Sequence, residues 1–244
     1  MRKFAPVITN AQIKLIRSLR EKKFRDREGL FVVEGDKMVK EALASGFDVV
    51  EVFRADEIGT EAMSRISSQS TPAPSLAVVR IPAPSPLPEP SGLCLALDTV
   101  RDPGNLGTIV RLADWFGIEQ IYASEHTVEL YNPKTVQATM GSVFRKRVHY
   151  CNLPDVCRRF TAAGLEVYGT YMEGESLYTA GLKSDGLIIM GNEANGISAE
   201  VSSCITRRIT VPSFAEGATS ESLNVAIATA ITVSEFRRRQ SFLE

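Results

Sequence analysis

The chain has 244 residues and a formal net charge of −1 at pH 7, with 44% hydrophobic and 23% charged residues. These values are ordinary for a soluble protein with one or two domains, and they exclude a uniformly basic chain that attracts nucleic acid by its net charge. Because no apolar run is long enough to span a membrane and the first ten residues contain no secretory signal, we expect no membrane association and a cytoplasmic location.

Positive charge is concentrated at the start of the chain. Residues 1–27 contain nine basic and two acidic side chains, a net charge of +7 that leaves −8 for the rest. Such a cluster is either the solvated face of a helix or a phosphate-binding patch, and both interpretations stay open at this point. The candidates for contact with nucleic acid are Arg17, Arg20, Lys22, Lys23 and Arg25.

The first 82 residues predict a small α/β domain, with Asn10 placed to cap the first helix. The expected elements are helix 11–24, strand 30–34, helix 36–45, strand 49–53, helix 60–68 and strand 76–81. From Pro82 to Pro90 every second residue is proline, which removes amide donors and favours an extended spacer. We therefore predict a domain over 1–82, a linker over 83–92 and a second domain over 93–244.

The second domain alternates strands and helices, which predicts an α/β fold with a mostly parallel sheet flanked by helices. The expected strands are 93–100, 120–123, 165–170, 187–190 and 208–211. The expected helices are one ended by Gly117, then 133–140, 153–163 and 223–239. In the last helix the spacing predicts a buried stripe of Leu223, Ala226, Ile227, Ala230 and Ile231.

Cysteine and histidine are too few and too scattered for a structural metal site. The residues concerned are Cys94, Cys151, Cys157, Cys204, His126 and His149. No Cys-x-x-Cys pair occurs, so we predict neither bound metal nor a disulfide framework, and interpret the cysteines as buried, reduced thiols of a reducing cytoplasm.

Three segments at the ends of expected strands carry the residues most suited to chemistry: 102–111, 190–196 and 222–226. Ligands of open α/β sheets bind at this edge. Gly191 and Gly196 have the spacing of a phosphate-binding loop, yet the lysine such a loop requires is missing, and no Gly-x-Gly-x-x-Gly occurs. Nucleotide hydrolysis and dinucleotide binding are therefore disfavoured.

Each segment also has a purely structural interpretation. Asn195-Gly196 is suited to a turn with positive φ, followed by Ser198 as a helix cap, and Ser222 is suited to cap the last helix. Arg111 points away from the apolar face of its helix, so by itself it is an ordinary surface arginine. The functional interpretation is that Gly191 lets the backbone approach a ligand, beside polar groups at the sheet edge.

Taken together, the segments resemble the motifs of the SpoU/TrmH family of RNA ribose 2′-O-methyltransferases. Asn105-x-Gly-x-x-x-Arg111 resembles the first motif, Gly191-Asn192-Glu193-x-x-Gly196 the second, and Val211-Pro with Ser222-Leu223-Asn224 the third. The stretch 137–145 resembles the region between motifs, and 30–35 with the helix after it resembles an RNA-binding domain of the ribosomal protein L30e fold. One departure is the loop 213–221, about three residues longer than usual in the family.

The resemblance implies a trefoil knot in the second domain that holds S-adenosylmethionine in a bent shape, largely through main-chain groups. The positions that match the cofactor-binding residues are Thr170, Gly191, Asn192, Gly196, Val211 and Leu223. The knot could not be expected from periodicity, because knots are nearly absent from proteins.

For the reaction, the resemblance assigns the removal of the ribose hydroxyl proton to Arg111, with Asn105, Glu193, Ser222 and Asn224 as positioning groups. Arginine almost never loses a proton in proteins. A phosphate of the RNA that relays the proton, or an Arg111 that only stabilises the developing alkoxide, are the alternatives.

The resemblance also implies a homodimer through the knotted domain, with Arg111 acting in its own or in the partner's site. The separate N-terminal domain favours ribosomal RNA over transfer RNA as the substrate. Two rivals remain: a catalytically silent, knotted RNA-binding protein, and a base methyltransferase that uses Asp102 or Glu193 as its base.

Overall fold

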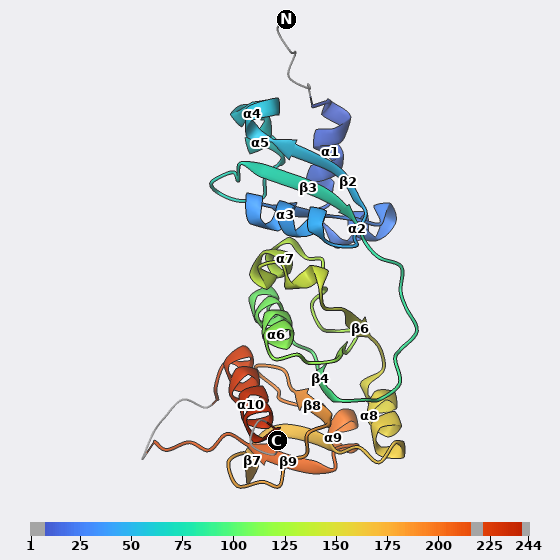
Figure 1. The fold of residues 1–244 in the computed structure, drawn as a ribbon, viewed down its shortest axis with the longest axis vertical. Coiled ribbons are helices and arrows are strands. Elements are labelled where there is room, and N and C mark those ends of the chain that lie inside the picture. The colour runs from blue at the N-terminus through green and yellow to red at the C-terminus, as the bar shows by residue number, and fades with distance from the viewer. Residues whose placement is uncertain (1–7, 216–221, 241–244) are drawn as a thin grey trace, which may run out of the picture. The chain divides into compact units, whose positions relative to one another are not determined.

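The computed structural model describes residues 8–215 and 222–240 (Figure 1). The chain divides into two compact units, one of residues 1–85 and 129–145 and one of residues 86–128 and 146–244. Each unit is described by itself. Segment 129–145, which the sequence pattern places in the second domain, thus belongs with the N-terminal residues.

The first unit contains a three-stranded antiparallel sheet with the strand order β1-β3-β2. Its elements up to the linker are α1 (Asn10–Ser18), α2 (Lys22–Glu28), β1 (Leu30–Glu34), α3 (Asp36–Ala44), β2 (Val49–Arg54), α4 (Ala55–Ile58), α5 (Thr60–Ile66) and β3 (Ser75–Arg80). The strands fall where the apolar runs predict them, and β1 and β3 are buried on both faces or nearly so.

The prediction of one N-terminal helix over 11–24, capped by Asn10, was wrong. Thr9 is the cap, and it forms a capping box with Gln12. The helix ends at Ser18 and a second one begins at Lys22. The buried guanidinium of Arg25 donates to the carbonyl of Leu19 at 2.6 Å, so a carbonyl freed by the break finds a partner.

Segment 129–145 packs on β1 through α7 (Pro133–Thr139) and the 3₁₀ turn η1 (Ser142–Phe144). The ring of Tyr131 lies 4.6 Å from that of Phe31, and Phe144 meets Phe47 edge to face at 5.2 Å. Glu129 pairs with the buried Arg25. Aromatic burial and this ion pair explain why the segment belongs to the first unit.

The second unit contains a six-stranded sheet in the order β6-β5-β4-β8-β7-β9, and all its strand pairs are parallel. Its elements are β4 (Leu93–Leu97), α6 (Pro103–Trp115), β5 (Ile121–Ala123), β6 (Val148–Tyr150), α8 (Leu153–Ala162), β7 (Val167–Ser176), β8 (Gly186–Met190), α9 (Ala199–Ser202), β9 (Arg207–Thr210) and α10 (Val225–Gln240). The predicted parallel α/β fold is confirmed, whereas β6 was missed because its three residues include His149 and Tyr150 and show no apolar run.

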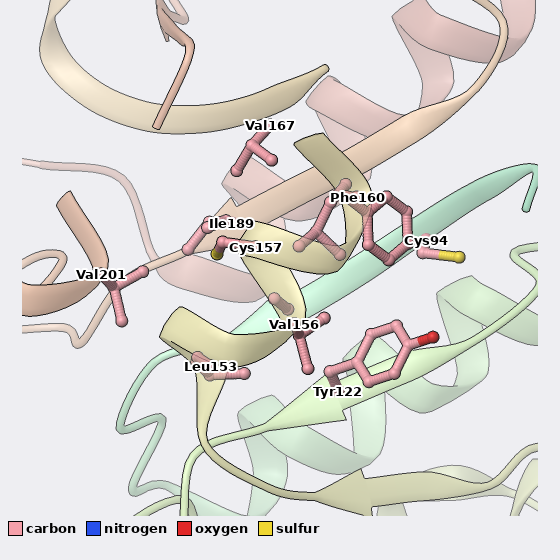
Figure 2. Packing of buried hydrophobic residues seen from close by; sticks show 11 residues of the cluster. Cys94, Tyr122, Leu153, Val156, Cys157, Phe160, Val167, Ile189 and Val201 are labelled. Carbon is pink, nitrogen blue, oxygen red and sulfur yellow. The ribbon is translucent and has the colours of Figure 1, made fainter. Parts of the chain in front are cut away.

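Helix α8 covers one face of this sheet (Figure 2). Its residues Leu153, Val156, Cys157 and Phe160 are at most 2% exposed and lie against Tyr122 and Ile189 of the sheet. Burial raises the pKa of the Cys157 thiol to about 12. The predicted burial of the thiols is confirmed for Cys157 and for Cys94, while Cys151 and Cys204 are half-buried.

The predicted buried stripe of the last helix was wrong for two of its three largest members. Leu223 and Ile227 are 49% and 53% exposed. The buried face of α10 instead consists of Val225, Ala226, Thr229, Thr232, Val233, Glu235 and Phe236. Thr229 is accommodated there because its hydroxyl donates to the carbonyl of Val225 at 2.7 Å.

Helix α10 packs parallel to α6 and is fixed at both ends. Near its last turn, Arg237 donates to the carbonyls of Phe116 and Gly117, which end α6. Arg239 donates to the carbonyls of Ala180 and Leu177. Arg237 and Arg239 thus bond to main-chain carbonyls outside their own helix. The carbonyls that Arg237 binds lie at the C-terminus of a helix, α6.

Strand β9 has partners from two parts of β7. Ile209 pairs with both Thr170 and Glu175, and the register shifts between them. A Cβ on Gly174 would meet main-chain atoms of Arg208 at 3.0 Å, so the connecting stretch passes close to β9. No helix within 8–215 or 222–240 is long and apolar enough to cross a membrane.

Candidate active site

The strand register brings the ends of β4, β8 and β9 to one edge of the sheet. Leu97 pairs with Met190, and Thr170 pairs with Ile209, with Gly169 beside Ile189 linking the two pairs. Since all these strands are parallel, their carboxyl ends form a single edge. The first and second motifs and Val211 therefore emerge beside one another.

The second motif is a tight loop closed by its own main chain. Asn192 and Gly196 exchange main-chain hydrogen bonds, and Gly196 has a φ of 66°. A Cβ on Gly191 would lie 2.4 Å from the carbonyl carbon of Gly196. Glycine is thus required at 191 by the chain's own backbone. The expectation that Gly191 lets the backbone approach a ligand stays a prediction.

Two residues at the tip of β4 anchor this loop. Asp98, which is 3% exposed, accepts a hydrogen bond from the main-chain N–H of Ser198 at 2.8 Å. The carbonyl of Thr99 accepts one from the side-chain amide of Asn192 at 2.7 Å. Ser198 precedes α9 but does not cap it as predicted, since its hydroxyl accepts no hydrogen bond from the described first turn of this helix.

A hydrogen-bonded trio joins the three motifs. The amide of Asn105 donates to Glu193 Oε1 at 2.9 Å, and the amide of Asn224 donates to Asn105 Oδ1 at 3.0 Å. The N-cap Asp102 accepts from the main-chain N–H of Asn105. The trio leaves the second carboxylate oxygen of Glu193 near the amide of Asn192, 3.4 Å away.

Asn224 has a structural task as well. It stands directly before α10, and its Oδ1 accepts from the N–H groups of Ala226 and Ile227. It is therefore the cap of α10 rather than a residue within the helix, as the sequence pattern suggested. One amide both begins the helix and reaches the first motif.

Arg111 lies about 9 Å along α6 from Asn105, given the rise of a helix. Its side chain is exposed, and no hydrogen bond or ion pair of it occurs within the described ranges. Ser222 is exposed and follows the undescribed residues 216–221, where most of the long loop predicted over 213–221 lies. The structure thus brings together Asn105, Glu193 and Asn224, and leaves Arg111 and Ser222 without a contact to them.

The cofactor candidates offer main-chain rather than side-chain groups. Gly191 and Val211 are half-buried, and within 8–215 and 222–240 no backbone partner of their N–H groups occurs. The Thr170 hydroxyl is used internally, donating to the carbonyl of Ile189 at 2.9 Å. Leu223 is half-exposed. Open main-chain groups beside a short apolar wall suit an adenine ring and a sulfonium, neither of which needs a fixed anion.

The basic candidates divide into two kinds. Arg17, Arg20, Lys22 and Lys23 are exposed, although Lys22 pairs with Asp26 and Lys23 with Glu21. Arg25 is 1% exposed and pairs with Glu129. This burial removes Arg25 from the residues that can meet RNA, and its desolvation lowers the pKa of Arg25.

The sequence pattern missed Asp98, Thr99 and Trp115. Asp98 and Thr99 directly follow a buried strand, but nothing in their identity marks them as anchors. Trp115 is 85% exposed and stands one turn after Arg111 on α6, a spacing that places both side chains on one face.

Comparisons with known proteins show the family of this chain. Residues 92–234 match the model of the SpoU rRNA Methylase family, and residues 10–78 match the MRM3-like substrate binding domain. The 23S rRNA (guanosine(2553)-2′-O)-methyltransferase RlmP of Bacillus subtilis is 32% identical over 93% of this chain and 96% of its own.

Solved structures resemble the whole chain. A TrmH-family protein of Porphyromonas gingivalis is 42% identical with a TM-score of 0.86, covering 96% of this chain and 99% of its own. An rRNA methyltransferase of Sinorhizobium meliloti, solved with AdoMet bound, is 32% identical with a TM-score of 0.84, covering 95% of this chain and 96% of its own.

Fold, strand-edge site and these relatives together define an S-adenosylmethionine-dependent RNA ribose 2′-O-methyltransferase. The chain belongs to the SpoU rRNA methylase family. The match to the SpoU family model covers most of the second unit, and the match to the substrate binding domain covers most of the first.

Proposed function

We propose that this enzyme methylates a ribose 2′-hydroxyl of ribosomal RNA, with residues 1–82 as a substrate-binding domain, 83–92 as a linker and 93–244 as the catalytic domain. The observation that carries the proposal is the trio of Asn105, Glu193 and Asn224, which joins three motifs at a strand edge with open main-chain groups. The name of the Bacillus relative and the N-terminal family match support ribosomal RNA as the substrate.

S-adenosylmethionine supplies the methyl group, and main-chain groups of Gly191, Val211 and Leu223 would hold it, with Thr170, Asn192 and Gly196 shaping the site. The trio has one carboxylate and two amides, a set that can hold the hydroxyls of a ribose by hydrogen bonds. Asn105 is the central member, since it contacts both others.

Arg111 is the group we assign to the reacting oxygen. A guanidinium keeps its charge, so its task is to stabilise the developing alkoxide while a phosphate of the bound RNA accepts the proton. Its exposure and the absence of a partner within the described residues leave its five donors available for this. Ser222 completes the set of positioning groups.

In the first unit, Arg17, Arg20, Lys22 and Lys23 would bind RNA phosphates. Arg17 has no acidic partner within the described ranges, while Lys22 and Lys23 share their charge with neighbouring carboxylates. Ribosomal RNA as substrate and buried thiols agree with a cytoplasmic location.

We also propose a homodimer through the outer face of α6 and α10. Trp115 on α6, Ile227 on α10 and Leu223 just before α10 are large apolar side chains that are 85%, 53% and 49% exposed. Large apolar side chains exposed in this way are typical of protein interfaces. Because Arg111 shares the face of Trp115, pairing of two copies would carry Arg111 toward the partner's site.

The chain has one tryptophan, which makes this dimer testable by fluorescence. We expect sedimentation to give a dimer and the emission of Trp115 to shift to longer wavelength on dilution. Trp115→Glu should give a monomer. We expect this monomer to bind S-adenosylmethionine, or its demethylated product, more weakly than the dimer does. A monomer at high concentration would contradict the proposal.

The knot expected from the family resemblance remains a proposal. It is supported by the two partners of Ile209, Thr170 and Glu175, because a strand with partners on both sides lies between them. Gly174, where a Cβ would be in tight contact with the main chain of Arg208, would be the point where the loop closes over β9.

The function is tested with ribosomal RNA from a strain that lacks the gene. Purified enzyme and methyl-labelled S-adenosylmethionine should label one nucleotide, and alkaline hydrolysis should leave the bond after it intact, because only 2′-O-methylation blocks that cleavage. Cleavage there would indicate base methylation. Labelling of transfer RNA alone would contradict ribosomal RNA as the substrate. Cofactor binding without any labelling would favour a catalytically silent RNA-binding protein.

A further inference from the structure

Thr99 has a backbone conformation that its side chain disfavours. Its φ is 61°, and within the described residues only Met140 is another non-glycine with positive φ. A β-branched residue in this left-handed region is strained, so the surrounding structure must hold it there. Strain of this kind concentrates at functional sites, and Thr99 lies between β4 and the first motif.

Hydrogen bonds from two strand ends hold Thr99. Its N–H donates to Ser124 Oγ at 2.8 Å, and its hydroxyl contacts Asp98 Oδ1 at 3.2 Å. Ser124 lies 3.2 Å from the hydroxyl of Thr127, which in turn donates to the carbonyl of Leu97 at 3.0 Å. Asp98 is 3% exposed, so this network is sheltered from water.

The left-handed backbone conformation of Thr99 determines the direction of its carbonyl. That oxygen accepts from Asn192 Nδ2 at 2.7 Å. The orientation of the Asn192 amide is settled by its other end, because Oδ1 accepts from the N–H groups of Ala194 and Asn195. Asn192 thus ties the turn of the second motif to β4.

The same tie determines where Glu193 stands. Glu193 is the next residue after Asn192, and its carboxylate holds Asn105 at 2.9 Å. On the far side of the loop, Asp98 holds the N–H of Ser198. Two adjacent residues, Asp98 and Thr99, therefore fix both ends of the loop that carries Glu193.

We propose that Thr99 is a positioning residue, whose left-handed backbone aims its carbonyl at Asn192 and thereby sets Glu193 against Asn105. Asn192 acts with it rather than through a contact with the cofactor. The inference rests on the proposed methyl transfer for its kinetic consequence, but the geometry of the loop can be measured without turnover.

Two substitutions at 99 separate backbone from side chain. Thr99→Gly removes every side-chain contact but adopts φ 61° freely, so we expect kcat within about twofold of wild type. Thr99→Val keeps the shape but loses the hydroxyl that contacts Asp98, so the strained turn relaxes and kcat should fall about tenfold. If the side chain of Thr99 had only a structural role, Thr99→Gly would lower kcat more than Thr99→Val does.

A third variant tests the receiving end. Asn192→Asp keeps the acceptor for Ala194 and Asn195 but places a carboxylate against the Thr99 carbonyl. We expect kcat to fall at least about tenfold while the Kd for S-adenosylmethionine changes less than about threefold. The matched control is Asn195→Asp in the same loop, which should stay within about twofold.

Hydrogen exchange of the Asn192–Gly196 amides supplies the readout that needs no activity. Exchange should be faster in Thr99→Val and Asn192→Asp and unchanged in Thr99→Gly. Equal kcat for Thr99→Gly and Thr99→Val, or full activity of Asn192→Asp, would overturn the proposal. If the wild type proves inactive on RNA, the proposed function fails, whereas the exchange pattern still decides the role of Thr99.

Discussion

The strand-edge trio of the second unit and the basic helices of the first use polar residues in opposite ways. Asn105 bonds to residues 88 and 119 positions away in sequence, with each atom fixed by a different element. On α2, Lys22 pairs with Asp26 within one helical turn and stays exposed. The first arrangement depends on the positions of single atoms, whereas the second depends on summed charge, so substitutions in the two should differ in size and in salt dependence.

The largest expected effect is that of Arg111→Ala. Removing the only cation we assign to the reacting oxygen should lower kcat by about a thousandfold, about 4 kcal/mol of transition-state stabilisation, with cofactor affinity changed only a few fold. Single-turnover transfer and calorimetry measure the two quantities. Arg158→Ala, an exposed arginine of α8, is the control. Full activity in the variant would remove Arg111 from the mechanism.

Arg25 is the exception among the basic residues, and it sharpens the comparison. Arg25→Ala leaves Glu129 without its partner in a mostly buried position, which should cost about 3 kcal/mol of stability in the first unit. Thermal unfolding measures this, with Arg17→Ala as the matched surface control. Loss of RNA affinity without loss of stability would return Arg25 to the RNA-binding surface.

Asn105→Asp tests whether the trio depends on individual atoms. The new carboxylate would face Glu193 Oε1 where an amide now donates at 2.9 Å, so kcat should fall about a hundredfold, near 3 kcal/mol. Asn132→Asp, which keeps a helix N-cap oxygen in the first unit, serves as control. A variant with normal kcat would show that the trio is structural only.

The stability that Glu235 contributes near the C-terminus of α10 should decrease in acid. Hydrogen bonds from Arg238 and then Arg239 lower the pKa of Glu235 to about 2. A carboxyl whose folded pKa is depressed stabilises the protein above its unfolded pKa near 4.5, and this contribution is lost as pH falls toward 2. Since Arg238 is largely exposed, about 1 kcal/mol is expected. Glu235→Gln should flatten the stability profile between pH 5 and pH 2, and an unchanged profile would contradict this assignment.

The smallest effects belong to the surface cations. Arg17→Ala should weaken RNA binding a few fold, equally for all sequences, and reduce the slope of affinity against salt by about one. Lys22→Ala should do less, because Asp26 already neutralises part of its charge. Titrations at several salt concentrations measure both, and an effect confined to one RNA sequence would indicate base contacts instead.

Local pattern determined much of this protein. Apolar runs and turn residues predicted the strands β1 to β5, β8 and β9 within a few residues and the first part of β7, and the runs are clearest in β1, β3, β4 and β8, where both faces are buried or nearly so. Motif spacing likewise picked out Asn105, Glu193 and Asn224, whose contact the structure shows. Their proximity follows from parallel strands ending at one edge.

Tertiary structure alone decided what depends on partners distant in sequence. The sequence did not show which face of α10 is buried, because threonines occupy core positions where leucine and isoleucine were expected, and Thr229 bonds to its own helix. The burial of Arg25 depends on Glu129, 104 residues away, and the strained turn at Thr99 depends on Ser124 and Asn192. A sequence records which groups can bond or pack, whereas the choice among partners is made by the packing of the whole chain.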